Sequence, residues 1–393
     1  MSTRTGLDLL VHQHFATLKG KAVGIVCNQA TVDSSLKHFL EHVSSPQYKE
    51  NLNIKAVFGP QHGLFGHTQD NMIEWEGGTN SRFPFPIFSL YGKHREPTET
   101  MLKGIDLLVV DLPDIGARYY TFIWTMALCL KACERLGIPV EILDRPNPIS
   151  GEQVEGPVLD PEFASFVGLY PLPLRHGMTL GEIGLYLQAH FFPKVKLSVA
   201  RAEGWSRSQY LDETGVPWTM PSPNMPTLDT AILYPGGCLL EGTTLSEGRG
   251  TTRPFETVGA PYIDGWKLCD GLNALSLLGV YFRPIQFQPT FQKHAGEICE
   301  GAFVHVLNRE IFKPVLTYAA LIREIYRSYP QLFHWQSPPY EYEEIKLPID
   351  ILAGNEWLRK SIVEYENLDS IAERAYEEAS RFDVIRRNFL LYI

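Results

Sequence analysis

The chain has 393 residues, a formal net charge of −10 and a hydrophobic content of 44%, as expected of a globular protein long enough for two domains. The acidic balance argues against a nucleic-acid partner, because such binding needs a basic surface. The longest apolar stretch lies within residues 122–130 and is too short to cross a bilayer, so we expect no membrane insertion.

The start of the chain and its cysteines predict a reducing compartment. Residues 1–8 contain no apolar core of a signal peptide, so we expect a cytoplasmic protein, or a periplasmic or secreted one if a leader has been trimmed. The six cysteines include no Cys-x-x-Cys pair, and scattered free thiols suit a reducing environment. Cys129 and Cys133 are four residues apart on an apolar segment, a spacing that favours packing over metal binding.

The first 150 residues predict alternating strands and helices. Short apolar runs predict strands at residues 22–27, 54–58, 86–90, 105–110 and 139–143. A helical stretch is expected near 36–43, and a longer apolar helix at 122–136, closed by Gly137. Continuous apolar strands separated by helices indicate a Rossmann-like, doubly wound parallel sheet in an α/β fold.

The second half predicts a different organisation. Residues 150–235 are rich in proline and glycine, with one helix near 179–189 that begins at a capping-box pattern, Thr179 and Glu182. Further helices are expected near 265–278, 314–329 and 371–389, with a strand at 302–306. We therefore predict a Rossmann-like N-terminal domain over residues 1–235 and a smaller α+β C-terminal domain over 236–393.

Polar residues follow each predicted strand, where open parallel sheets bind their ligands. They are Asn28, Gln61 with His62, Asp111 with Asp114, and Asp144 with Arg145 and Asn147. Turn chemistry alone also enriches Asp and Asn at strand ends, but we favour a site here.

The most informative segment is residues 241–256, which places three glutamates and two arginines in sixteen residues interrupted by glycine and proline. This composition argues against a regular helix or a buried strand and predicts a shaped polar loop for a charged or sugar-like ligand. Glu241 follows apolar residues, which can raise the pKa of a carboxyl as a general acid requires. Glu247 with Arg249, and Glu256 with Arg253, are alternatively structural ion pairs.

Common catalytic signatures are absent: the chain has no GxGxxG after its first strand, no P-loop, no HExxH and no GxSxG. Carboxylates remain the best acid–base reagents, and glycoside hydrolysis commonly uses two of them. Glu74 and Glu76 flank Trp75, a candidate sugar-stacking ring, although Glu74 is alternatively a surface acid. A zinc site built from His62, Asp111 and His176 is the remaining metal hypothesis.

Nine short runs, taken in order, resemble the exo-β-N-acetylmuramidases of the NamZ family over nearly the whole chain. They are residues 24–29, 58–63, 89–92, 111–120, 144–148, 175–179, 241–256, 291–296 and 352–354. The resemblance implies a Rossmann-like domain, a smaller C-terminal domain and an active-site cleft between them. It also implies release of terminal N-acetylmuramic acid from the non-reducing ends of peptidoglycan fragments, with no metal or organic cofactor.

This comparison and the residue patterns together define the expected site. We expect catalytic roles for Glu76, Glu241, His62 and Asp111. Substrate-binding residues are expected to be Asn28, Gln61, Arg118, Tyr119, Asn224, Glu247, Arg249, Arg253 and Glu256. The arginines would grip the lactyl carboxylate of the sugar, whereas Tyr119 either lines a pocket or packs. None of these motifs specifies an oligomeric state.

One departure from the family pattern bears on activity. Family members often have Pro-Glu-His-Gly where this chain has Pro60-Gln61-His62-Gly63, and an amide cannot replace a carboxylic acid as proton donor. Glu76 or Glu74 would then take over, or this branch has altered specificity or has lost activity. Three hypotheses follow: an exo-glycosidase, a non-catalytic cell-wall sugar-binding protein, and a metal-dependent hydrolase using the same cleft.

Overall fold

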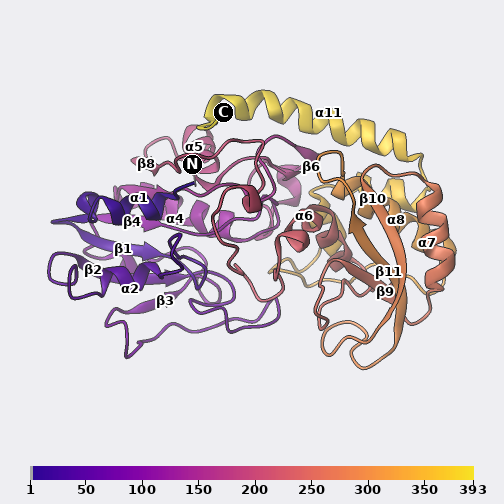
Figure 1. Cartoon of the computed structure of the whole chain (residues 1–393), viewed down its shortest axis with the longest axis horizontal. Helices are drawn as coiled ribbons and strands as arrows, with labels where there is room; N and C mark the ends of the chain where they lie inside the picture. Colours follow the sequence, from indigo (N-terminus) through magenta and orange to yellow (C-terminus); the bar gives the residue numbers. More distant parts are fainter. Residues whose placement is uncertain (1–2) are drawn as a thin grey trace.

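The computed structural model describes residues 3–393. A six-stranded parallel sheet occupies one end of the molecule and a three-stranded antiparallel sheet occupies the other (Figure 1). Helix α6 (Leu228–Gly237) lies between the two sheets, and helix α11 (Leu368–Arg386) runs along the top across both. The protein therefore has a parallel α/β unit and a smaller C-terminal unit.

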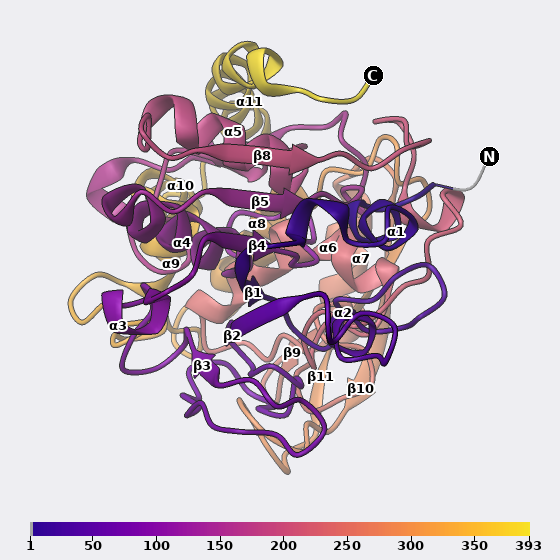
Figure 2. The same ribbon diagram turned by 90° about the vertical axis from the view of Figure 1, so that its left-hand side faces the viewer.

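The parallel sheet has the strand order β3-β2-β1-β4-β5-β8, which Figure 2 shows from bottom to top. Its strands are β1 (Ala22–Val26), β2 (Asn53–Gly59), β3 (Ile87–Ser89), β4 (Leu107–Val110), β5 (Val140–Leu143) and β8 (Leu197–Ala200). The order reverses between β1 and β4, as in doubly wound sheets. Every residue of β1, β4 and β5 is buried, so the predicted Rossmann-like α/β fold is confirmed.

The helices of this unit are α1 (Gly6–His12), α2 (Phe39–Val43), α3 (Glu99–Leu102), α4 (Phe122–Leu136) and α5 (Leu180–His190). The sequence predicted a terminal signal for α4 and for α5. Helix α4 ends at Gly137, whose φ of 69° is a left-handed conformation that glycine tolerates best. Helix α5 begins at the predicted capping box, in which Thr179 and Glu182 satisfy each other's backbone N–H groups.

The C-terminal unit is built on an antiparallel sheet with the order β10-β11-β9. Its strands and helices are β9 (Thr257–Ala260), β10 (Val280–Phe287), β11 (Cys299–Val306), α7 (Gly265–Ala274), α8 (Pro314–Ser328), α9 (Pro348–Ala353) and α10 (Trp357–Val363). A separate two-stranded sheet pairs β6 (Glu155–Val158) with β7 (Pro173–Arg175). Helix α6 packs on α8 and leads into the 3-10 turn η4 (Cys238–Gly242), which packs on α9.

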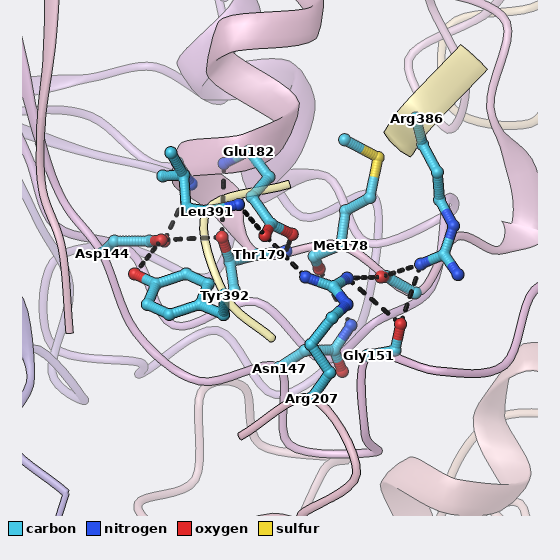
Figure 3. Close-up of polar contacts among 12 residues, drawn as sticks. Asp144, Asn147, Gly151, Met178, Thr179, Glu182, Arg207, Arg386, Leu391 and Tyr392 are labelled. Atoms are coloured by element: carbon cyan, nitrogen blue, oxygen red, sulfur yellow. Dashed lines mark hydrogen bonds and ion pairs between the residues drawn. The ribbon is translucent and has the colours of Figure 1, made fainter. Parts of the chain in front are cut away.

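The chain end returns to the parallel sheet and closes a buried network that we call the C-terminal polar cluster: Asp144, Thr179, Glu182, Arg207, Arg386 and Tyr392 (Figure 3). The Tyr392 hydroxyl and the Thr179 hydroxyl each donate to Asp144 at 2.7 Å. Arg207 donates to Glu182 at 2.6 Å, and Arg386 donates to the carbonyl of Gly151 at 2.8 Å. This network ties the last residues of the chain to the carboxyl end of β5.

Two further observations bear on the sequence predictions. Within residues 3–393, no helix is long and apolar enough to cross a membrane. All six cysteines are buried thiols without a disulfide partner.

Candidate active site

A pocket opens where the two units meet, and both contribute to its walls. The first unit supplies Gln61, His62, Asn71, Tyr119, Tyr120, Thr121, Phe122, Val167, Ser222, Asn224 and Met225. Helix α6, η4 and the second unit supply Tyr234, Cys238, Glu241, Arg249, Phe255, Tyr340 and Glu341. Most of the polar groups described below are almost fully buried, so their interactions are little weakened by solvent.

Gln61 and His62 reach the pocket because β2 ends directly before them, at Gly59. His62 has a φ of 69°, and this turn lets its Nδ1 donate to the carbonyl of Thr68 at 2.8 Å. Burial lowers the pKa of His62 to about 4, so the ring is neutral at neutral pH and Nε2 is an acceptor. His62 is therefore suited to hydrogen bonding in the pocket and not to carrying charge.

Glu241 lies at the end of η4, and both of its carboxyl oxygens accept hydrogen bonds. Oε1 accepts from Arg249 at 2.7 Å, and Oε2 accepts from the Asn71 amide at 2.9 Å and from the Tyr340 hydroxyl at 2.5 Å. The next residue is Gly242, where a Cβ would lie 2.6 Å from the Cα of Ile349 in α9. The glycine thus allows η4 to approach α9 closely, and this contact fixes the position of Glu241.

Two cations and two carboxylates pair with one another in the pocket wall and directly behind it. Arg249 pairs with Glu241 and also with Glu247, at 3.2 Å, and Lys293 pairs with Glu247 at 3.0 Å. Burial opposes the charge on Arg249, but Glu241 and Glu247 raise the pKa of Arg249 above its ordinary value. Glu247 therefore supports the pocket from behind Arg249 and is not among the residues that line it.

The residue that the sequence interpretation missed is Glu341, which is 3% exposed. Its Oε1 accepts from the Gln61 amide at 3.1 Å and its Oε2 accepts from the Tyr91 hydroxyl at 2.8 Å. Burial raises the pKa of Glu341 to about 7, and the negative charge of Glu241 adds to the rise, whereas the two hydrogen bonds oppose it. A carboxyl group that holds its proton near neutral pH therefore lies in the pocket wall.

The contact between Glu341 and Gln61 bears directly on the departure from the family pattern. The Thr121 hydroxyl donates to Gln61 Oε1 at 2.6 Å, which turns the amide nitrogen toward Glu341. The position that carries glutamine instead of glutamate thus lies in contact with a carboxyl group from the other unit. The signal in the sequence was the run Pro338-Pro339-Tyr340-Glu341-Tyr342, in which an acid lies between aromatic residues next to two prolines.

Two strand-end candidates bond to other parts of the chain and do not line the pocket. Asp111 is fully buried and accepts from Arg145 Nε at 2.5 Å and from Nη2 at 2.9 Å. Asn28 donates from its amide to the carbonyl of Pro221 at 3.0 Å. Both residues hold the carboxyl edge of the parallel sheet together, and neither lines the pocket.

Three candidates from the charged motifs also lie outside the pocket lining. Arg118 is fully buried and donates to the carbonyls of Pro157, Leu172 and Leu352. The Arg253 side chain is 46% exposed and pairs with Glu256, which also accepts from the Thr230 hydroxyl at 2.9 Å. The structure therefore does not support the expectation that Arg118 and Arg253 grip the ligand.

The other two substrate-binding candidates do line the pocket. Tyr119 contributes its ring, while its hydroxyl donates to the carbonyl of Pro235 at 3.0 Å. Asn224 donates to the carbonyl of Gln69 at 2.8 Å, so it also holds the loop that carries Asn71.

The acids around Trp75 face a different surface. Glu74 and Glu76 are exposed and line an open groove that also includes Lys93. Trp75 is buried, and its indole N–H donates to the carbonyl of Pro60 at 2.9 Å, so its ring is not an open stacking platform. The structure does not support a catalytic role for Glu76, because its carboxyl lies outside the pocket.

The proposed ligands of a zinc site contact different partners and do not converge on one point. Asp111 is bound by Arg145, and the buried His176 ring lies 3.2 Å from Asp114. In the part of the chain that the structure describes, no three His, Cys, Asp or Glu side chains form a group that could hold a metal ion.

Comparisons with known proteins match this architecture. The N-terminal model of the exo-β-N-acetylmuramidase NamZ matches residues 23–229, and the C-terminal NamZ model matches residues 232–392. The peptidoglycan β-N-acetylmuramidase NamZ of Bacillus subtilis (strain 168) is 41% identical over 391 residues, covering 99% of this chain and 91% of that protein.

Two crystal structures of DUF1343 family proteins from Bacteroides fragilis are also similar. One has a TM-score of 0.89 at 30% identity and the other 0.76 at 27%, and each alignment covers 100% of this chain and 99% of the other. The protein thus belongs to the family of exo-β-N-acetylmuramidases named NamZ.

Proposed function

We propose that this protein is an exo-acting glycoside hydrolase that releases terminal N-acetylmuramic acid from the non-reducing ends of peptidoglycan fragments. The substrate class and the exo action rest on family membership and on the similarity to the Bacillus subtilis relative. The observation that carries the chemistry is a single interdomain pocket with two carboxyl groups in unlike environments, Glu341 and Glu241.

Glu341 is assigned as the general acid. Its pKa of about 7 leaves roughly half of the carboxyl groups protonated at neutral pH, and a general acid works best when its pKa lies near the working pH. In the reaction, the Glu341 proton passes to the glycosidic oxygen as the bond to the anomeric carbon breaks. The leaving sugar departs as an alcohol, and Glu341 becomes a carboxylate. A water molecule then adds to the anomeric carbon and gives a proton to the Glu341 carboxylate, which releases free N-acetylmuramic acid and restores the acid.

Glu241 is assigned to the opposite role. A carboxylate that accepts from Arg249 and Tyr340 is held in one orientation and is an acceptor, not a donor. Placed in the same pocket, it stabilises the positive charge that develops on the sugar ring as the glycosidic bond breaks. The two carboxyl groups therefore have different roles because their environments differ. Glu341 is buried with uncharged donors, and Glu241 is bound by a guanidinium.

Gln61 and Tyr91 are assigned as positioning residues. Each donates a hydrogen bond to one oxygen of Glu341, so they hold its carboxyl in one rotamer without taking part in proton transfer. In this account, the amide at position 61 supports an acid that comes from residue 341.

The test is to incubate the purified protein with a chromogenic β-N-acetylmuramide and, in parallel, with the matching β-N-acetylglucosaminide. We expect release from the muramide, with free N-acetylmuramic acid identified by mass spectrometry. Release from the glucosaminide alone would contradict the proposed sugar specificity. Absence of release from both, together with binding of N-acetylmuramic acid, would instead support a non-catalytic sugar-binding protein.

A further inference from the structure

We infer that Gln292, in the connection between β10 and β11, is a positioning residue of the pocket: it holds the loop of residues 67–72 so that Asn71 stays in contact with Glu241. The inference deepens the proposed function and rests on it for the role of Glu241. Gln292 is not among the described residues that line the pocket, so it acts through the side chains that it holds.

The connection contains a bend in which three consecutive side chains contact different parts of the structure. Gln292 has a φ of 68° and His294 a φ of 58°, a left-handed conformation that is uncommon outside glycine. Lys293 donates to the carbonyl of Leu240 in η4 at 3.0 Å. His294 donates to the carbonyl of Thr244 at 2.9 Å. Such backbone strain persists only where surrounding contacts hold it, and it is concentrated at functional sites.

The side chain of Gln292 reaches the first unit and binds Asp70. Its amide nitrogen lies 2.8 Å from each carboxylate oxygen of Asp70, which is 222 positions earlier in the chain. A carboxylate accepts hydrogen bonds and does not donate them, so the amide nitrogen is the donor. A hydrogen bond to a charged group is stronger than one between neutral groups. The bend is therefore fixed to both units, through Asp70 on one side and through η4 on the other.

The loop that Gln292 holds carries Asn71 into the pocket. Asn71 lines the pocket and donates its amide to Glu241 Oε2 at 2.9 Å. In the first unit, Asn224 donates to the carbonyl of Gln69 at 2.8 Å and holds the start of the same loop. Gln292 holds it from the second unit, one residue before Asn71.

The functional consequence concerns the orientation of Glu241. In the proposed reaction, its carboxylate stabilises the positive charge that develops on the sugar, and this effect requires a carboxylate that is fixed before the reaction. Asn71 binds one of its oxygens, and Gln292 limits the movement of Asn71. A misplaced group lowers the rate of the chemical step more than it weakens substrate binding. Loss of the Gln292 contact should therefore lower kcat and leave KM nearly unchanged.

The experiment exchanges the two groups in contact. Gln292→Glu places two carboxylates opposite each other, so we expect kcat on a muramyl disaccharide to fall about 10- to 100-fold as the loop is released. The double variant with Asp70→Asn and Gln292→Glu again pairs an amide with a carboxylate, with the hydrogen bond reversed. We expect its kcat to return to within about threefold of the wild type. Two independent structural defects would instead add their losses.

Two further variants separate this contact from a general defect. Gln286→Glu is the matched control, because Gln286 donates to Glu300 at 2.7 Å on the surface of the second unit and lies outside the pocket lining. Its kcat should stay near that of the wild type. Gln292→Gly removes the amide but suits the left-handed backbone, so its unfolding midpoint should stay near that of the wild type while kcat falls.

Proteolysis of the native chain measures the contact without any turnover. Met72 and Ile73 are each 46% exposed at the end of the loop, and thermolysin cleaves before such apolar residues once the chain opens locally. We expect cleavage at these bonds to be about tenfold faster in Gln292→Glu, as for an opening equilibrium shifted tenfold. The double variant should be cleaved at the wild-type rate.

The outcomes distinguish this inference from the proposed function. A wild-type chain that releases no sugar, with cleavage accelerated by Gln292→Glu and slowed again in the double variant, would support the positioning contact and contradict hydrolysis. Hydrolysis by the wild type with an unchanged kcat in Gln292→Glu would overturn the positioning role and leave the glycosidase intact. A double variant no better than Gln292→Glu, or a raised KM at constant kcat, would also overturn it.

Discussion

The C-terminal polar cluster and the interdomain pocket use the same kinds of buried residues to different ends. In the cluster, Asp144 accepts from two hydroxyls and a backbone N–H, and Glu182 accepts from Arg207 and two backbone N–H groups. In the pocket, burial raises the pKa of Glu341 to about 7, and its carboxyl lines the wall together with Glu241. The carboxylates of the cluster bond to other parts of the chain, whereas the two carboxyl groups of the pocket line a space beside which a ligand can bind.

The comparison also shows why a shifted pKa alone does not identify a catalytic group. Burial raises the pKa of Asp144 to about 6 and that of Glu155 to about 7, yet neither lines the pocket. Asp144 holds the chain end, and Glu155 accepts from the backbone N–H of Leu316 at 3.1 Å. Glu341 differs because its carboxyl lines the pocket together with Glu241, where in the proposed reaction the glycosidic oxygen of the substrate accepts its proton.

The largest expected effect is a loss of activity when a carboxyl group of the pocket is removed. Glu341→Gln removes the proposed proton donor, so we expect kcat on a muramyl disaccharide to fall by about 10²- to 10⁴-fold. Steady-state kinetics on the folded variant measure this loss. Glu344→Gln is the matched control, since Glu344 is exposed in the same loop, and a loss of similar size in that variant would contradict the assignment.

The next largest effect is a loss of stability when the C-terminal polar cluster is changed. Arg207→Ala leaves Glu182 without its cation and leaves the carbonyls of Gly151 and Gly177 with Arg386 as their remaining guanidinium donor, so we expect about 3–5 kcal/mol of destabilisation in denaturant unfolding. The kcat of the remaining folded protein should stay near that of the wild type. Arg387→Ala, whose side chain is 70% exposed, should change stability by less than about 1 kcal/mol; equal losses in both variants would remove the distinction between the two regions.

A smaller effect is expected in the pH dependence of stability, which titration of Glu341 should change. The folded pKa of about 7 lies above the ordinary value of 4.5, so the folded state holds a proton that the unfolded chain loses between these pH values. Wild-type stability should therefore fall as pH rises through this window. Glutamine does not titrate. The free energy of unfolding of Glu341→Gln should therefore rise by about 1–3 kcal/mol relative to that of the wild type between pH 5 and pH 8. A stability difference that stays constant with pH would show that Glu341 is not protonated in the folded state.

The smallest expected effect is the pH dependence of the wild-type enzyme. Because the acid form of Glu341 is the active one, kcat/KM should decline above an apparent pKa of about 7, approaching about a tenfold loss per pH unit. A profile from pH 5 to pH 9 with a muramide substrate measures it. Activity that rises steadily over this range would assign the limiting group to a base instead.

The sequence predicted the fold well where local signals were strong. The apolar runs that became β1, β4 and β5 are buried on both faces, and α4 and α5 begin or end at Gly137 and Thr179 as expected. Strand β8 was missed because its residues are mostly half-buried and its sequence lacks a continuous apolar run.

The site was harder to predict, because it depends on contacts between distant segments. Glu341 and Gln61 are 280 positions apart, and no local pattern indicates that an acid of the C-terminal unit meets the end of β2. Arg118 and Asp111 looked functional because charged residues near glycine or a strand end suit a site, but the fold uses both internally. Composition identified the residue types that matter, and tertiary packing decided which of them face the ligand.

The most direct test of the account is the dependence of Glu341→Gln on the leaving group. From a 2,4-dinitrophenyl β-N-acetylmuramide, the 2,4-dinitrophenolate ion departs without protonation, whereas a disaccharide with N-acetylmuramic acid at its non-reducing end needs a proton on the leaving oxygen. If Glu341 is the general acid, the variant should lose at least about 100-fold more kcat/KM on the disaccharide than on the dinitrophenyl substrate. Equal losses on both substrates would contradict the assignment of Glu341 as the proton donor.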